Sequence, residues 1–192
     1  MCGFTGYLSQ SSIDPSSHSE SIIKEMTRRL IHRGPDSEGF WRDCDAGIVM
    51  GFRRLAILDV SSNGNQPMIS NSGQYVLVFN GEIYNHLALR REISSIKPNY
   101  QWLSSSDTET LLSGFELWGI EKTIQKCTGM FGFSVWCNKN KVLTLGRDRL
   151  GEKPVYYGWQ GAPHDEIFLF GSELKSFHNH PGFQKEINRD AV

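Results

Sequence analysis

The chain has 192 residues, of which 39% are apolar and 11% aromatic, enough for a buried core in one large domain or two small ones. Lysine and arginine total 20 and aspartate and glutamate total 21, so the net charge is −1 and we expect no surface for nucleic acid or anionic membranes. No basic flank with a long apolar stretch begins the chain, and no apolar run approaches the roughly 18 residues of a membrane span. These features favour a cytoplasmic protein without a membrane segment.

The second residue, Cys2, is the first candidate for chemistry. Removal of Met1 would leave Cys2 with both a thiol and a free α-amine. Such an amine titrates near pH ~8 and a thiol near ~8.5, so a proton passes between them at little cost. One residue would then supply a nucleophile and its base. Because cysteine is small, we expect Met1 to be removed, although Met-Cys-Gly alone can also be an accidental start.

Apolar spacing and turn residues predict strands that outnumber helices. The predicted strands are residues 2–8, 47–51, 55–60, 75–79, 130–136, 142–146, 154–159 and 167–171, and the predicted helices are 19–32, 88–96 and 108–127. Elements that arrive in blocks of one kind favour an α+β fold in layers.

The last residues depart from this pattern. Asn188 is a good helix N-cap, and residues 189–192 resemble a first helical turn. We therefore expect one domain over residues 1–183 and, over 184–192, the start of a linker or helix that leads to a further domain. A frayed C-terminus is the alternative.

The four cysteines and a histidine pair offer no metal site. Cysteines 2, 44, 127 and 137 form no Cys-x-x-Cys pair, and three of them are expected to be reduced thiols without a special role. His178 and His180 stand beside Pro181-Gly182 without an acidic cluster, which favours a solvated turn.

Three further segments carry groups that a hydrolase of a side-chain amide would need. Arg54 offers a planar fork for a carboxylate, and Asn80 stands next to the Gly81 N–H, so that two donors could converge on one oxyanion. Asp107 could hold an ammonium group. Each has an ordinary alternative: a surface salt bridge for Arg54, a hairpin turn for Asn80-Gly81, and a helix cap for Ser106 to Glu109.

In combination, the motifs resemble a known family. They are Met1-Cys2-Gly3, His32-Arg33-Gly34-Pro35-Asp36, Arg54-Leu55-Ala56-Ile57-Leu58-Asp59, Asn65-Gln66-Pro67-Met68, Phe79-Asn80-Gly81-Glu82-Ile83-Tyr84-Asn85, Ser106-Asp107-Thr108-Glu109, Gly129-Met130-Phe131-Gly132-Phe133, residues 147–154 and residues 171–176. In this order they resemble the class II glutamine amidotransferase domain, and more narrowly the glutaminase half of glutamine-hydrolysing asparagine synthetases.

The resemblance implies a fold and a reaction. The fold is that of the N-terminal-nucleophile hydrolases, a four-layer αββα sandwich of two antiparallel sheets, with Cys2 at the end of an inner strand. By the same resemblance, Cys2 attacks the side-chain amide of L-glutamine and its α-amine carries the proton. Ammonia then leaves, and water hydrolyses the thioester.

The resemblance also implies roles for individual residues. Asn80 and Gly81 would bind the oxyanion, Arg54 the α-carboxylate, and Asp107 and Glu82 the α-ammonium, while Leu55, Ile57 and Leu58 would line the pocket. Arg33 would support the nucleophile or take a direct part. A loop within residues 53–66 would cover bound glutamine and be mobile without it.

Partners and cofactors follow in the same way. A C-terminal synthetase domain would use the ammonia for ATP-dependent asparagine synthesis, and a homodimer is left open. ATP and magnesium are expected only in that domain, because this chain has no Ser-Gly-Gly-x-Asp-Ser loop and its glycines at 146–151 lack a Gly-Lys-Ser ending. This domain itself is expected to hold no cofactor and no metal.

Two alternatives stay open at this point. The domain could serve another acceptor, such as a sugar acid, a sugar phosphate or a phosphoribosyl group. It could also be a non-catalytic domain that binds glutamine for regulation.

Overall fold

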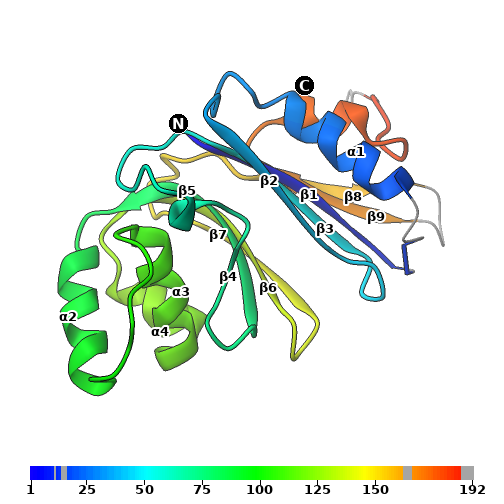
Figure 1. Cartoon of the computed structure of the whole chain (residues 1–192). Coiled ribbons are helices and arrows are strands. Elements are labelled where there is room, and N and C mark those ends of the chain that lie inside the picture. Colours follow the sequence, from blue (N-terminus) through cyan, green and yellow to red (C-terminus); the bar gives the residue numbers. More distant parts are fainter. Residues whose placement is uncertain (11, 14–16, 162–165, 187–192) are drawn as a thin grey trace.

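The strands form two antiparallel sheets that stack face to face, with helices on both outer surfaces (Figure 1). The computed structural model describes residues 1–10, 12–13, 17–161 and 166–186. Helix, sheet, sheet and helix follow one another across the molecule, so the predicted α+β fold in four layers is confirmed.

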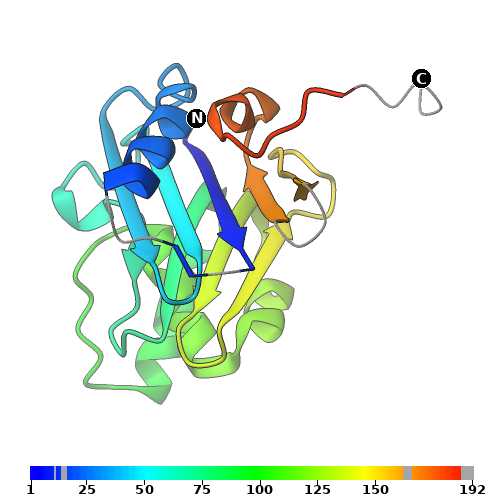
Figure 2. The ribbon, with the colours of Figure 1, turned by 90° about the vertical axis from the view of Figure 1, so that its right-hand side faces the viewer.

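The first sheet carries the start of the chain at its centre. Its strands lie in the order β2 (Ser37–Asp43), β3 (Ile48–Arg54), β1 (Gly3–Ser9), β9 (Ile167–Gly171) and β8 (Tyr156–Gln160). β1 pairs with β3 from Gly3 to Leu8 and with β9 from Thr5 to Ser9. Figure 2 shows β1 between these two neighbours.

The second sheet is built around one long antiparallel pair of strands. Its order is β4 (Met68–Ile69), β5 (Tyr75–Ile83), β6 (Gly129–Cys137) and β7 (Val142–Arg147). β5 pairs with β6 along its whole length, from Tyr75 opposite Cys137 to Ile83 opposite Gly129. This pairing fixes the position of Asn80 opposite Gly132.

The helices cover the outer faces of the two sheets. α1 (Ser17–Arg28) and the 3₁₀ helix η2 (Leu174–Asn179) lie on the first sheet, whereas α2 (His86–Ile96), α3 (Asp107–Trp118) and α4 (Ile120–Lys126) lie on the side of the second. A short 3₁₀ turn, η1 (Ser62–Gly64), lies in the loop after β3. Across the described residues, no helix has the length and apolarity needed to cross a membrane.

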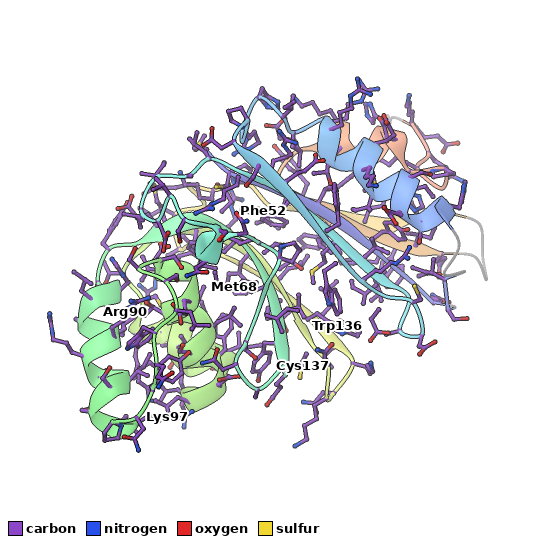
Figure 3. All side chains as sticks on the ribbon, viewed as in Figure 1. Phe52, Met68, Arg90, Lys97, Trp136 and Cys137 are labelled. Carbon is purple, nitrogen blue, oxygen red and sulfur yellow. The ribbon has the colours of Figure 1, made fainter. Side chains whose placement is uncertain are left out.

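The alternation of side chains along the strands produces the cores. On β5, Val76 and Val78 join the core between the sheets, while Leu77 and Phe79 join the core beneath α3. Phe52 and Trp136 lie between the sheets in Figure 3, and both are almost fully buried. Each such side chain contributes on the order of 1.5–3 kcal/mol through burial.

Two predicted elements differ in kind or number from the structure. Residues 55–60 are not a strand but an irregular loop, in which Ile57, Leu58 and Val60 are exposed. The predicted helix 108–127 is two helices, because Gly119 has a φ of 84° that ends α3.

Other boundaries also shift. The predicted helix 19–32 ends at Arg28, and the charged strand β2 was not predicted. The helix expected from Asn188 lies outside the described residues.

Candidate active site

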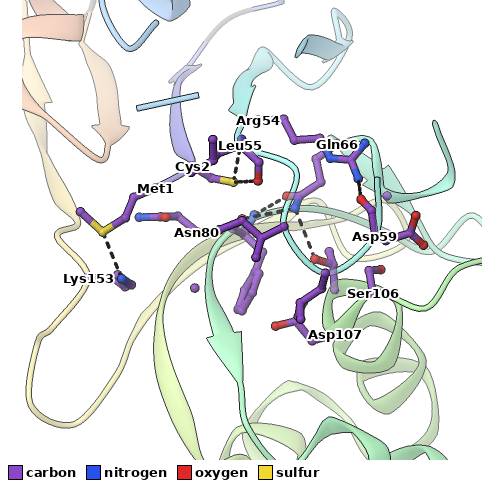
Figure 4. A pocket seen from close by; sticks show the side chains of 16 residues that line it. Met1, Cys2, Arg54, Leu55, Asp59, Gln66, Asn80, Ser106, Asp107 and Lys153 are labelled. Atoms are coloured by element: carbon purple, nitrogen blue, oxygen red, sulfur yellow. Dashed lines mark hydrogen bonds between the residues drawn. The ribbon is translucent and has the colours of Figure 1, made fainter. Parts of the chain in front are cut away.

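A pocket of about 90 Å³ lies where the beginning of β1, the end of β3, the second half of β5 and the beginning of α3 come together (Figure 4). Eight of the ten predicted site residues line it: Cys2, Arg54, Leu55, Ile57, Leu58, Asn80, Gly81 and Asp107. Arg33 and Glu82 do not line it. Met1 also lines the pocket, so its removal would enlarge the space beside Cys2.

Cys2 lies just before β1 and is half-buried. The Leu55 N–H donates to its Sγ at 3.3 Å, and the thiol reaches the Leu55 carbonyl at 3.5 Å. Burial raises the pKa of the Cys2 thiol, against the lowering effects of the Leu55 N–H, the charged chain terminus and Arg54. The thiol therefore needs a nearby base to become a nucleophile at neutral pH.

Arg33 holds the backbone of Cys2 in place. Its Nε donates to the Cys2 carbonyl at 3.0 Å, and its Nη1 forms an ion pair with Glu173 at 2.7 Å. A Cβ atom at residue 3 would lie 2.9 Å from Arg33 Cδ, so the absence of a side chain at Gly3 lets Arg33 come this close to the backbone. Burial acts to raise the pKa of Glu173, but hydrogen bonds from Arg33, Lys175 and His32 outweigh it and lower that pKa to about 2.

Asn80 carries a buried donor that has no partner. Its side chain is 2% exposed, and within the described part of the chain its Nδ2 makes no hydrogen bond. An unpaired buried donor costs about 1–3 kcal/mol, so this group can bind an acceptor that enters the pocket. Asn80 and Gly81 lie inside β5, and the alternative of a hairpin turn is therefore wrong.

Gln66 connects the loop after β3 to β5 and α3. Its Oε1 accepts from Phe79 N at 2.6 Å, and its Nε2 donates to the Phe79 carbonyl and to Thr108 Oγ1, each at 3.3 Å. No role was predicted for Gln66, although it belongs to one of the motifs that carry the resemblance. It holds the strand on which Asn80 lies.

Arg54 is 7% exposed and organises the loop that follows it. Its Nη1 donates to the Ser61 carbonyl and to Asn65 Oδ1, each at 2.7 Å, and its Nη2 donates to the Asp59 carbonyl. Among the described residues nothing accepts from Nε. Its N–H stays available to a carboxylate that enters the pocket, because arginine donors suit carboxylate oxygens. A buried Arg54 is not the surface salt bridge of the alternative reading.

Asp107 is the first residue of α3 and is 5% exposed. Its Oδ2 accepts from Ile83 N at 2.8 Å, and burial raises the pKa of the carboxyl group. Ser106 caps the helix by accepting from Glu109 N at 3.2 Å, as its sequence predicted. In the described chain Asp107 forms no ion pair. Glu82 is half-buried on β5 and does not line the pocket.

The loop of residues 55–66 covers one side of the pocket and is attached by polar contacts. The Asp59 carboxylate accepts from Ser61 and, at 2.8 Å, from Ser105 N. The hydrogen bond from the Ser61 hydroxyl is the main reason that the pKa of Asp59 is lowered to about 2. Asn63 donates to the Leu103 carbonyl at 2.7 Å, so the loop is tied to the segment before α3.

Lys153 also lines the pocket, although sequence reasoning gave it no role. Its side chain is 6% exposed, and its Nζ lies 3.1 Å from Met1 Sδ. Its residue type and its place in the segment 147–154 were the only sequence signals.

Relatives with known names cover nearly all of the chain. It is 40% identical over 176 residues to asparagine synthetase [glutamine-hydrolyzing] 1 of Bacillus subtilis, a match of 92% of this chain and 26% of that protein. It is 35% identical to asparagine synthetase [glutamine-hydrolyzing] 3 of the same organism, over 100% of this chain and 30% of that protein. The chain therefore spans less than a third of the length of these relatives.

A solved structure shares the fold at much lower identity. It is the glutamine phosphoribosylpyrophosphate amidotransferase of B. subtilis, complexed with ADP and GMP. The match has a TM-score of 0.74 at 18% identity and covers 92% of this chain and 43% of that one. The likeness confirms the predicted N-terminal-nucleophile hydrolase fold.

A family model described as "Glutamine amidotransferase domain" matches residues 1–192. This match extends over the entire sequence, including every residue of the pocket. The chain therefore belongs to the glutamine amidotransferase family, and its named relatives are glutamine-hydrolysing asparagine synthetases.

Proposed function

We propose that Cys2, once Met1 has been removed, hydrolyses L-glutamine to glutamate and ammonia. The thiol gives its proton to the α-amine, directly or through one water, and the sulfur attacks the carbon of the side-chain amide. When the C–N bond breaks, the proton leaves with ammonia and a γ-glutamyl thioester remains. Water then cleaves the C–S bond and restores the thiol.

The unpaired Nδ2 of Asn80 is the observation that supports this proposal most strongly. It is a buried donor without a partner in the described chain, and it lines the same pocket as the Cys2 thiol. A tetrahedral intermediate carries a negative oxygen that needs such a donor. With the Gly81 N–H as the second donor, Asn80 would complete an oxyanion hole.

Two groups of opposite charge would orient glutamine across the pocket. The Arg54 guanidinium, whose Nε has no acceptor in the described chain, suits the α-carboxylate, and Asp107 suits the α-ammonium. An arriving ammonium would also favour the charged form of Asp107, which burial now disfavours. Leu55, Ile57 and Leu58 would flank the substrate, whereas Glu82 would need to move to reach it.

The ammonia is proposed to serve a synthetase domain beyond residue 192, with residues 1–183 as the glutaminase domain. The shares of 26% and 30% in the relatives leave room for such a domain, and the relatives' names suggest that it makes asparagine. ATP and magnesium would bind there, and no cofactor would be needed here. A sugar acid, sugar phosphate or phosphoribosyl acceptor is the alternative.

The cytoplasm is the proposed compartment. All four cysteines are free thiols, and the proposed chemistry needs Cys2 in that state.

Glutamate release from glutamine tests the proposal, with intact mass used first to establish that Met1 has been removed. Cys2→Ala should abolish release. Cys44→Ala is the matched control, because Cys44 is also a half-buried free thiol, and it should retain the rate of the wild type. Release that persists in Cys2→Ala, or a wild type that binds glutamine without cleaving it, would overturn the catalytic assignment.

The acceptor needs a separate assay on the chain with its synthetase domain. With glutamine, ATP and magnesium present, aspartate should give an amidated product. A product formed only from a sugar acid, sugar phosphate or phosphoribosyl compound would support the alternative.

A further inference from the structure

Lys153 is a buried cation whose position is fixed by its backbone. The Asp148 carboxylate accepts from Lys153 N at 3.1 Å, and Arg147 Nε donates to the Lys153 carbonyl at 2.8 Å. With 6% of its surface exposed, the side chain has lost most of its contact with water. A desolvated ammonium group normally has an anionic or strongly polar partner.

The partner of this ammonium is a residue that we expect the mature protein to lack. Within the described ranges, its Nζ forms no ion pair, and its one hydrogen bond is to Met1 Sδ, at 3.1 Å (Figure 4). A methionine sulfur is a weak acceptor. When Met1 is removed, the sulfur disappears and the nitrogen of Cys2 becomes a free amine close to the space that Met1 occupied.

We propose that Lys153 is a positioning residue that keeps the α-amine of Cys2 in its neutral, basic form. This inference rests on the proposed function. Two effects act in the same direction: a nearby positive charge disfavours a second one, and an ammonium donor can bond to the lone pair of a neutral amine. The amine of Cys2 would then accept the thiol proton at a lower pH than the amine of an isolated chain terminus would.

The other charged groups around Cys2 are bound to different partners, or they would favour the protonated form of its α-amine. Arg33 binds the Cys2 carbonyl and is neutralised by Glu173. Arg54 is engaged by its own loop, and Asp107, if ionised, would favour a protonated amine. Like Arg54, Lys153 is a pocket cation whose charge no carboxylate of the described chain offsets, but unlike Arg54 its side chain donates to no backbone carbonyl there.

The test compares Lys153→Met, which removes the charge at similar length, with Lys153→Arg, which keeps it. The readout is the pH dependence of kcat/KM for glutamate release. In Lys153→Met the midpoint of the acidic limb should rise by about one pH unit, with the rate recovered at higher pH. Lys153→Arg should keep the midpoint of the wild type, and so should the control Lys24→Met, at an exposed lysine of α1.

A second readout does not depend on turnover. Competitive acetylation of the amine of Cys2 as a function of pH reports its protonation directly, and the amine of Lys153→Met should react as a weaker nucleophile at neutral pH. Intact mass must show that Met1 is absent in every variant. If Lys153→Met does not fold, Lys153→Gln takes its place.

The outcomes separate this inference from the proposed function. An unchanged acidic limb and an unchanged amine titration in the neutral variants would overturn the role of Lys153. A loss of rate that is equal at every pH would also overturn it. A shifted amine titration in a protein that never cleaves glutamine would support Lys153 and reject the glutaminase assignment.

Discussion

The two sides of the pocket are built in different ways. One side consists of strand residues, with Cys2 before the central strand β1 and Asn80 inside β5, and both strands are paired on each side. The other side is the loop of residues 55–66, which is attached through hydrogen bonds of Arg54 and Asp59. We therefore expect the strand side to hold the reacting groups rigidly, and the loop side to recognise the substrate and to move.

Asn80→Ala should have the largest effect and should act on the strand side. Losing one oxyanion donor typically lowers kcat by about 10²–10³-fold, and KM should change little. Because Nδ2 has no partner in the described chain, the free energy of unfolding should fall by no more than about 1 kcal/mol.

Steady-state glutamate release and denaturant unfolding measure these two quantities. Asn138→Ala is the control, because Asn138 donates to the Gly73 carbonyl at the far end of the hairpin of β6 and β7. A small change in kcat for Asn80→Ala would show that the strand side does not hold the oxyanion.

Arg54→Lys should act mainly on KM, because lysine cannot offer two parallel donors to a carboxylate. The expected increase is about 10–100-fold, corresponding to the loss of a charge-assisted bidentate contact. Arg53→Lys is a close control, since Arg53 is equally buried but binds Glu38 and the Gly34 carbonyl outside the pocket. Equal changes in KM for both variants would contradict substrate binding by Arg54.

Asp59→Ala should have the smallest effect and should act on the mobility of the loop. It removes the contact to Ser105, so limited proteolysis within residues 55–66 should become about 5-fold faster. Because the pKa of Asp59 is lowered to about 2, the carboxylate stabilises the loop fully above pH ~4 and loses this effect as the pH falls toward 2.

Added glutamine should slow the same cleavage in the wild type, as a loop that covers the substrate requires. Asp45→Ala, in the exposed turn between β2 and β3, should leave the cleavage rate unchanged. Cleavage that glutamine does not slow would show that the loop does not close on the substrate.

The strand side could be predicted from the sequence more fully than the loop side. The short stretch at the start of the chain and the apolar run from Tyr75 to Phe79 identified β1 and β5, and both strands are mostly buried. The motifs at the strand ends then placed Cys2 and Asn80 in one pocket.

The predicted strand over residues 55–60 is wrong because its apolar residues do not pack in a sheet. Ile57 is 72% exposed and Val60 is 82% exposed, so the run from residue 55 to 60 resembles a buried strand only in composition. Its conformation depends on Arg54 and Asp59, whose partners Asn65 and Ser105 could not be inferred from local sequence. Lys153 and Glu173 were missed for the same reason, since each contacts a residue far away in the chain.

The central place of β1 has a practical consequence for anyone who produces this protein. It pairs with β3 on one side and with β9 on the other, and Arg33 donates a hydrogen bond to the carbonyl of Cys2. An affinity tag fused ahead of Cys2 would convert its α-nitrogen, the proposed base, into a peptide amide. The tag would also occupy the space beside the thiol in the pocket. Purification handles therefore belong at the opposite end, or must be cut away so that the thiol-bearing residue comes first.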